Sequence, residues 1–198
     1  RFTTARAKAC KESRVVFLAV GTPPKDDGSP DMSFYQQAAK DVAEAMNGYK
    51  VLVTKSTVPV GTGKWLREFV NQNLSEPTEF GVASNPEFLR EGKALEDFMI
   101  PDRVVVGVED ETARAAMEHL YFPQTKNGHP LYFMDIASSE MTKYASNTFI
   151  AARISLINEL AQICEKTGAD IEKVRTAVGA DKRIGQKYIY PGVGYGGS

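Results

Sequence analysis

The sequence predicts an α/β fold: a doubly wound parallel sheet, followed by an all-α region built around one long helix. Over the first two-thirds of the chain, short apolar runs rich in β-branched residues alternate with helical patterns, as in strand–helix–strand units. The first run, VVFLAV at 15–20, is apolar throughout, which is typical of a strand buried on both faces of a parallel sheet. From about Ser138 the alternation stops and one long helical pattern takes over.

Short apolar runs are expected to form the strands of the sheet. Most connections between these runs are long enough to hold a helix, which parallel neighbours require. In chain order the expected strands lie at 15–20, 51–55, 80–84, 104–108 and 131–134.

The helices between the strands have recognisable ends. Ser33 and Gln36 fit a capping box at the start of the first helix, and Gly48 is expected to stop it. The next two helices are expected at about 63–74 and, behind an Asp110 cap, at about 111–120.

The long helix is expected at about 138–166, ended by Gly168, and a shorter one at 171–178 follows an Asp170 cap. Because the long helix is apolar on nearly all sides, we expect it to pack on the sheet domain and on a second body, such as the partner subunit of a homodimer. One stripe consists of Met141, Ala145, Phe149, Ala152, Leu156, Leu160 and Ile163, and the opposite side carries Ile150, Ile154 and Ile157.

Composition excludes several classes of protein. The net charge of −1 and the pI of about 6.2 give no basic field for nucleic acid. No apolar run approaches the ~20 residues needed to span a bilayer, and the N-terminus has no signal-peptide core. The two cysteines, Cys10 and Cys164, are far apart and fit no disulfide or metal framework, so a reducing, cytoplasmic location is expected.

Three polar or proline-containing loops follow strands of the predicted sheet, at 21–24, 55–59 and 85–92. Taken singly, each loop is explained as a turn, since Pro and Gly commonly end strands. The carboxyl ends of parallel strands share one edge, however, and ligands of such sheets bind in the crevice there. Three such loops at one edge therefore predict a binding site.

Two pairs of side chains four residues apart are candidate catalytic groups. On a helical turn, Glu87 and Glu91 would share a face and could perform acid–base chemistry, although solvated surface acids are the alternative. Lys143 and Asn147 lie on the side of the long helix opposite Met141. A lysine on so apolar a helix needs a partner, which a substrate oxyanion or the Glu87 carboxylate could provide.

The last loop, 191–198, is rich in glycine. Its backbone N–H groups could approach a phosphate or a sugar closely. It could equally be a flexible end of the chain.

At these residues the chain resembles the UDP-glucose/GDP-mannose dehydrogenase family. The resemblance covers essentially the whole chain, and two elements, RIGQKY and the Y-G-G-S ending, are more similar to the UDP-glucose branch than to the GDP-mannose branch. The matching stretches are VGTPPKDDGSPDMSF (20–34), KSTVPVGTG (55–63), SNPEFLREG (84–92), PDRVVVG (101–107), EMTKYASNTF (140–149), RIGQKY (183–188) and PGVGYGGS (191–198).

The resemblance implies two domains: part of an NAD-binding, Rossmann-like domain at 1–136 and a central helical dimerisation domain at 137–198. It also implies two-step, NAD-dependent oxidation of the C6 alcohol of UDP-glucose to a carboxylate, through a cysteine thiohemiacetal and thioester. The implied partners are UDP-glucose or a related nucleotide sugar and a second copy of the chain.

Roles for individual residues also follow from the resemblance. Thr57 and Glu87 belong to the acid–base and water-positioning machinery, Lys143 stabilises oxyanion character at C6, and Asn147 assists by hydrogen bonding. Arg183 reaches the substrate of the neighbouring subunit. The NAD site is lined by Val20, Gly21, Thr22, Pro23 and Ser56, with Glu91 near the nicotinamide. The sugar nucleotide contacts Glu87, Phe88, Leu89, Arg90, Glu91, Lys143, Asn147, Tyr190, Gly192, Gly194, Tyr195 and Gly196.

Two departures from the family pattern lead us to expect that the chain is an inactive part of a longer protein. The G-x-G-x-x-G dinucleotide fingerprint is absent, and Gly61-Thr62-Gly63 does not replace it. The family continues directly from G-G-S into its nucleophilic cysteine, whereas this chain stops at Ser198. Both Cys10 and Cys164 are better interpreted as packed small residues.

Several alternatives remain open. The specificity could be for UDP-N-acetylmannosamine or GDP-mannose. A more distant possibility is a two-domain hydroxyacid dehydrogenase, although that class lacks the S-N-P-E-F and G-Y-G-G-S elements. From another class, the chain could be a non-catalytic dimerisation module, which its long apolar helix would favour.

Overall fold

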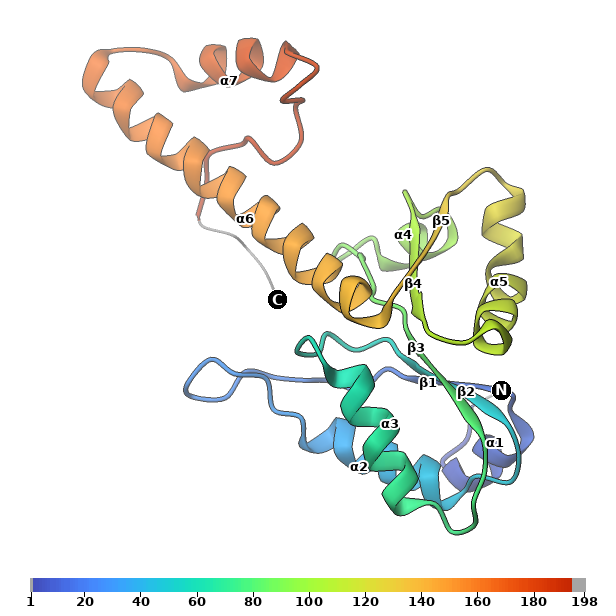
Figure 1. The fold of residues 1–198 in the computed structure, drawn as a ribbon. Coiled ribbons are helices and arrows are strands. Elements are labelled where there is room, and N and C mark those ends of the chain that lie inside the picture. Colours follow the sequence, from blue (N-terminus) through green and yellow to red (C-terminus); the bar gives the residue numbers. More distant parts are fainter. Residues whose placement is uncertain (1, 194–198) are drawn as a thin grey trace. The chain divides into compact units, whose positions relative to one another are not determined.

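A computed structural model describes residues 2–193 of the chain (Figure 1). The chain folds as two compact units, the first ending at Lys143 and the second beginning at Tyr144. The first unit holds the sheet, and the second holds most of the long helix and the segment that follows it.

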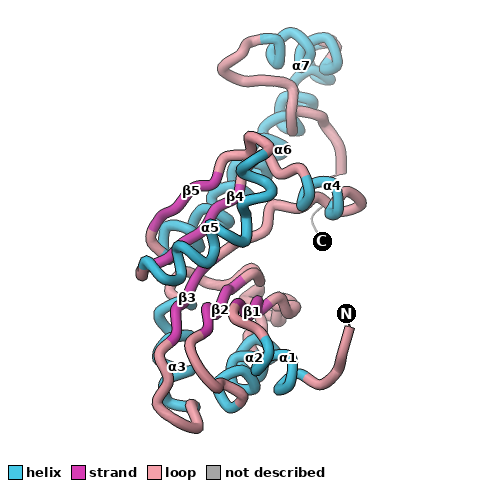
Figure 2. The backbone as a smooth tube through the Cα atoms, turned by 90° about the vertical axis from the view of Figure 1, so that its right-hand side faces the viewer, coloured by secondary structure: helices cyan, strands magenta, loops and turns pink. Residues whose placement is uncertain are grey.

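The sheet has five strands in the order β1-β2-β3-β4-β5. The β1–β2, β2–β3 and β4–β5 pairs are parallel, but β3 and β4 pair in antiparallel fashion. The prediction of a wholly parallel sheet was therefore wrong at this step. The strands, which lie side by side in Figure 2, are β1 (Val15–Leu18), β2 (Lys50–Thr54), β3 (Phe80–Ser84), β4 (Val104–Val108) and β5 (Leu131–Met134).

The connection between β3 and β4 explains the change of direction. Between Ser84 and Val104 the only helix is the short α4 (Ala94–Met99), and the remainder is loop. For β4 to run parallel to β3, a crossover would have to carry the chain back to the end of the sheet where β3 begins. This connection instead returns the chain at the carboxyl end of β3, where Ser84 pairs with Gly107.

Helices cover both faces of the sheet (Figure 1). On one face, α1 (Arg6–Glu12), α2 (Ser33–Glu44) and α3 (Thr62–Asn73) enclose a core around Leu52 and Val82, both fully buried. On the other face, α5 (Glu111–Lys126) packs Ala113, Met117 and Tyr121 against Val53 and Val106. The alternation of apolar residues along β2 and β3 thus serves two cores.

The first strand lies at an edge of the described sheet. It ends at Leu18, earlier than predicted, and the Phe17 side chain is 37% exposed. The prediction of burial on both faces is therefore wrong for the described residues. An apolar edge strand presents unpaired backbone groups to which another strand can bind.

Two predicted helix boundaries also need correction. Ser33 is the first residue of α2 and makes no side-chain cap; instead, the Asp31 carboxylate accepts a hydrogen bond from the Ser33 N–H at 2.9 Å. Helix α5 continues beyond Leu120 and through Pro123, because Tyr121 anchors its last turns in the core at 5% exposure. The predicted Asp110 cap is confirmed, since its side chain accepts from the Ala113 N–H at 2.7 Å.

Helix α6 (Ile136–Thr167) begins in very close contact with the sheet unit. A Cβ atom added to Gly107 on β4 would lie 2.6 Å from Ser139 Cβ and 2.7 Å from Ile136 Cα. A Cβ on Gly63 of α3 would overlap the Ile136 side chain. Two glycines therefore allow the first turn of α6 to pack directly on β4 and α3.

The second unit consists of the rest of α6 and of α7 (Ile171–Ala180) with its flanking loops. Gly168 ends α6 with a φ of 74°, and Asp170 caps α7, both as predicted. Arg153 on α6 donates to the main-chain oxygens of Ile184 and Gly185 at 2.9 and 3.1 Å. These bonds hold the segment after α7 against α6.

Candidate functional site

The loops that follow β1 and β2 are joined by two side-chain hydrogen bonds. The Thr22 hydroxyl donates to the main-chain oxygen of Thr57 at 2.8 Å, and the Ser56 hydroxyl donates to that of Val20 at 2.6 Å. Gly21 lies between them with no heavy atom within 4 Å of the position that a Cβ would occupy. The structure thus brings these predicted residues together and leaves open space beside Gly21.

The loop after β3 carries the main charged pair. Glu87 is half-buried, and its carboxylate oxygen Oε1 lies 2.7 Å from Lys143 Nζ. The same ammonium donates to the Glu87 main-chain oxygen at 2.6 Å. Lys143 is only 8% exposed, so the expectation that it needs a partner, and that Glu87 could be that partner, is confirmed.

The Phe88 ring lies near Lys143 and contacts a second cation, Arg103. The Arg103 guanidinium lies 3.9 Å from the centre of the Phe88 ring, and Lys143 Nζ lies 5.7 Å from it. Glu87 Oε2 also accepts a hydrogen bond from the Leu89 N–H at 2.6 Å. The carboxylate therefore has a defined orientation and two different partners.

A second lysine belongs to this region and was given no role by the sequence patterns. Lys55 follows β2, and its Nζ donates to Asn85 Oδ1 at 3.1 Å. Burial, aided by the nearby Lys143 charge and opposed by the Glu87 carboxylate, lowers the pKa of Lys55 to about 8. The cost of burying this ammonium is the signal that distinguishes it from a surface lysine.

Glu140 was also missed. It is 3% exposed, and its carboxylate accepts hydrogen bonds from the Gly61 N–H at 2.6 Å and the Gly63 N–H at 2.7 Å. Burial raises the pKa of Glu140, and the hydrogen bonds partly oppose this. Glu140 thereby ties the V-P-V-G-T-G segment at 58–63, which directly follows Thr57, to the helix that carries Lys143.

The remaining residues of the 87–91 stretch are arranged differently from the prediction. Residues 85–90 are irregular loop, so Glu87 and Glu91 do not share one helical turn. Leu89 and Glu91 are exposed, and Arg90 forms a bidentate pair with Asp97, including a bond of 2.5 Å.

The other predicted substrate residues belong to the second unit. Asn147 lies on α6, Arg183 pairs with Asp181 at 2.6 Å, and the Tyr190 ring lies 4.4 Å from the Arg175 guanidinium. The Gly192 N–H donates to the Asn158 side chain at 2.8 Å. Gly194, Tyr195 and Gly196 lie outside the described residues.

Neither cysteine lies in this site. Cys10 is 6% exposed in the core under α2, and burial raises the pKa of its thiol. Cys164 on α6 is 7% exposed. Their interpretation as packed small residues is confirmed.

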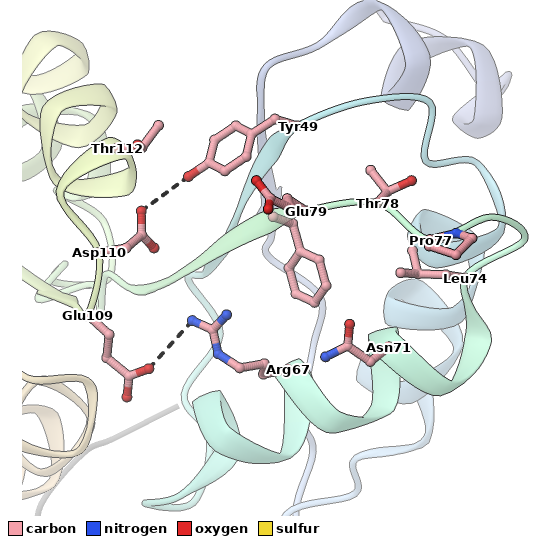
Figure 3. A pocket seen from close by; sticks show the side chains of 11 residues that line it. Tyr49, Arg67, Asn71, Leu74, Pro77, Thr78, Glu79, Glu109, Asp110 and Thr112 are labelled. Atoms are coloured by element: carbon pink, nitrogen blue, oxygen red, sulfur yellow. Dashed lines mark hydrogen bonds and ion pairs between the residues drawn. The ribbon is translucent and has the colours of Figure 1, made fainter.

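An open groove of about 860 Å³ lies at the opposite ends of the strands (Figure 3). It is lined by residues near the beginnings of β2 and β3, among them Tyr49 and Phe80. An Arg67–Glu109 ion pair of 3.4 Å and a hydrogen bond from Tyr49 to Asp110 cross it. It contains no predicted site residue.

Residues 2–193 contain no cluster of His, Cys, Asp and Glu that could hold a metal ion. Within the same described range, no helix has the length and hydropathy to cross a bilayer.

We expect Lys55 to make stability rise between pH 8 and about pH 9. In this range the folded lysine has lost its proton, whereas the unfolded lysine, with a pKa of 10.5, still holds it. The unfolded state therefore binds more protons, and the free energy of unfolding increases by at most about 1.4 kcal/mol per pH unit. Urea unfolding at pH 7, 8 and 9 measures this. A Lys55→Met variant with the same rise would contradict the assignment.

Comparison with known proteins places these features in context. Residues 1–125 match the NAD-binding domain of the UDP-glucose/GDP-mannose dehydrogenase family, and residues 137–198 match its central domain. The UDP-glucose 6-dehydrogenase YwqF of Bacillus subtilis is 47% identical over 197 residues, which are 100% of this chain and 44% of the relative. The chain therefore spans less than half the length of this relative.

Two solved structures are similar in fold. A UDP-glucose dehydrogenase from the archaeon Pyrobaculum islandicum superposes with a TM-score of 0.94 at 41% identity, covering 100% of this chain and 46% of the other. A GDP-mannose dehydrogenase from Pseudomonas aeruginosa gives 0.86 at 29% identity, covering 99% and 46%.

Proposed function

The chain belongs to the UDP-glucose/GDP-mannose dehydrogenase family, and from this premise we propose that the full-length protein is an NAD-dependent UDP-glucose 6-dehydrogenase. The observation that supports this best is the buried Lys143–Glu87 pair of 2.7 Å at the carboxyl end of β3. A positive charge and a carboxylate held together there suit the oxidation of an alcohol, which needs both a proton acceptor and a group that stabilises an oxyanion.

In this proposal Glu87 and Thr57 handle protons and water, and Lys143 stabilises negative charge on the oxygen at C6. Asn147 adds a hydrogen bond to the same oxygen. From the family resemblance, Tyr190 and Gly192 are further proposed contacts to the sugar nucleotide, and Arg183 is proposed to reach the substrate of the neighbouring subunit. The covalent step is assigned to neither cysteine of this chain, because both are buried.

The loop residues after β1 and β2 fit the proposed NAD. Val20, Gly21, Thr22 and Pro23 form an open edge beside Ser56, and the free space at Gly21 permits close approach of a planar ring. When bound, NAD supplies the acceptor for the hydride that leaves the sugar carbon. These residues would hold NAD at the edge of the sheet where the strands β1 and β2 end.

The decisive test is turnover by the full-length protein with UDP-glucose and NAD. We expect the NADH absorbance to show that two NADH molecules form for each UDP-glucose consumed. A panel with GDP-mannose and UDP-N-acetylmannosamine separates the alternative specificities. No turnover with any sugar nucleotide would exclude the proposal and leave the non-catalytic dimerisation module.

We also propose that the protein is a homodimer formed through α6. Phe149, Leu156 and Ile163 follow one another at intervals of seven residues, so they lie on one stripe. They are 74%, 61% and 54% exposed within the chain. An apolar stripe of this size on a helix indicates a protein partner rather than solvent.

Leu156→Glu should therefore convert the protein to monomers, because two carboxylates would face each other across the stripe. Sedimentation velocity of the full-length protein measures the change. Glu165→Ala, an exposed position on the side of α6 opposite Leu156, is the control and should leave the dimer intact. A wild-type protein that sediments as a monomer would refute the proposal.

A further inference from the structure

Asn85 is the most highly connected polar side chain near the proposed site. It is 1% exposed and directly precedes the Pro86–Glu87 step. Its side-chain Nδ2 donates to the Val105 main-chain oxygen at 2.8 Å, and its N–H donates to that of Thr54 at 2.9 Å. These bonds join the loop after β3 to both neighbouring strands.

The Asn85 side-chain oxygen accepts two further hydrogen bonds. Lys55 Nζ, at the end of β2, lies 3.1 Å from Oδ1, and the Tyr121 hydroxyl on α5 lies 2.5 Å from it. Tyr121 is 5% exposed, and burial raises the pKa of its hydroxyl to about 12. Both ends of the Asn85 amide are thus hydrogen-bonded, and three partners, Lys55, Val105 and Tyr121, fix its orientation.

A purely structural role does not account for the ammonium in this network. A neutral donor could satisfy Asn85 Oδ1 without the cost of burying a charge. Lys55 nevertheless interacts electrostatically with Glu87 and Lys143, and its Nζ lies 5.9 Å from the centre of the Phe98 ring. Buried charges that are retained at an energetic cost beside a reactive group are characteristic of functional sites.

We propose that Lys55, Asn85 and Tyr121 form a positioning network that fixes the loop after β3 and so holds the Glu87 carboxylate in register with Lys143. The proposal rests on the proposed function, in which Glu87 and Lys143 act on the substrate. None of the three residues needs to touch the substrate. They act through the main chain, since only Pro86 separates Asn85 from Glu87.

The first test is kinetic and uses the full-length protein. Each of the variants Lys55→Met and Tyr121→Phe removes one of the two donors to Asn85 Oδ1. The loop after β3, which carries Glu87, should then become more mobile. We expect kcat to fall by about 10- to 100-fold in Lys55→Met, because small misplacements of catalytic groups lower rates by such factors. The fall in Tyr121→Phe should be smaller. KM for NAD should change less than about twofold, because neither Lys55 nor Tyr121 is among the residues proposed to line the NAD site.

Lys50→Met is a matched control. Lys50 is a buried lysine, 4% exposed, at the start of β2, whereas Lys55 follows the end of that strand. The Lys50 Nζ donates to the Ser13 main-chain oxygen at 2.7 Å. The same substitution there removes a buried ammonium far from Glu87. It should lower stability while kcat stays within about twofold of wild type.

The pH profile of kcat provides a readout that a merely structural residue would not change. The charged or titratable groups around Lys55 are Glu87 from the loop after β3, Lys143 from α6 and Tyr121 from α5. Loss of the Lys55 charge above pH 8 should contribute to the alkaline limb in the wild type. That contribution should be absent in Lys55→Met and present in Lys50→Met.

The second test does not need activity. The Leu89 N–H donates to Glu87 Oε2, so its hydrogen exchange reports whether the loop holds its form. We expect exchange about 10-fold faster in Lys55→Met and in Tyr121→Phe, and no change in Lys50→Met. Unchanged exchange in the first two variants, or an equal increase in the control, would overturn the network. If the wild type turns over no sugar nucleotide, the proposed function fails and the exchange data alone decide the network.

Discussion

Replacement of Lys143 with methionine in the full-length protein is expected to lower kcat by about 10²- to 10³-fold, the usual cost of removing one donor to a developing oxyanion. Methionine nearly preserves the volume of the side chain but carries no charge. The substitution also removes the partner 2.7 Å from Glu87 Oε1, although the Leu89 N–H still donates to the other carboxylate oxygen. The loss should therefore fall mainly on catalysis, with about 1 kcal/mol of stability lost as well.

Steady-state kinetics at saturating NAD and UDP-glucose measure the effect. Lys64→Met, an exposed lysine on α3, is the control and should retain full kcat. An equal fall in kcat in both variants would indicate a general effect of lost charge. A Lys143→Met enzyme with normal kcat and a raised KM would show that Lys143 only binds substrate.

The second large effect is expected from Gly107→Ala, which should reduce the free energy of unfolding by about 3 kcal/mol or more. The new Cβ would lie 2.6 Å from Ser139 Cβ, 2.7 Å from Ile136 Cα and 2.9 Å from the Asp135 main-chain oxygen. Two of these three contacts are backbone atoms, which cannot move aside as a side chain can. Helix α6 would have to shift away from β4.

Urea unfolding of wild type and variant gives the difference directly. Gly21→Ala is the matched control, because its Cβ would meet nothing within 4 Å. Gly63→Ala should also be destabilised, since its Cβ would overlap Cγ2 of Ile136, a methyl group that the stiff β-branched side chain cannot easily move aside. Equal stability of the Gly107 and Gly21 variants would show that α6 does not pack as tightly on β4 as described.

Much of the fold was predictable because its elements carry local signals. The fully buried strands β2 and β3 follow from continuous apolar runs, and Asp110 and Asp170 marked the starts of α5 and α7. The Lys143–Glu87 pair was also predictable, since a lysine on an apolar helix demands a counter-charge.

Other features depend on tertiary contacts that no local pattern encodes. The direction of β4 is set by how the 85–103 connection folds back, and strand propensity is the same in either direction. The links of Asn85 to Tyr121 and of Glu140 to Gly61 join residues 36 and 79 positions apart. Their partners could be identified only after the sheet had brought them together.

The carboxylate of Glu140 has a consequence for how the protein can bind a nucleotide. The free amides at the start of a helix usually attract a phosphate, but those of Gly61 and Gly63 at the start of α3 already hold an anion that belongs to the chain itself. A dinucleotide phosphate would have to displace a carboxylate that is tethered in place and shielded from water. The diphosphate must therefore find its donors in another loop, and α3 serves the architecture of the site without competing for its ligands.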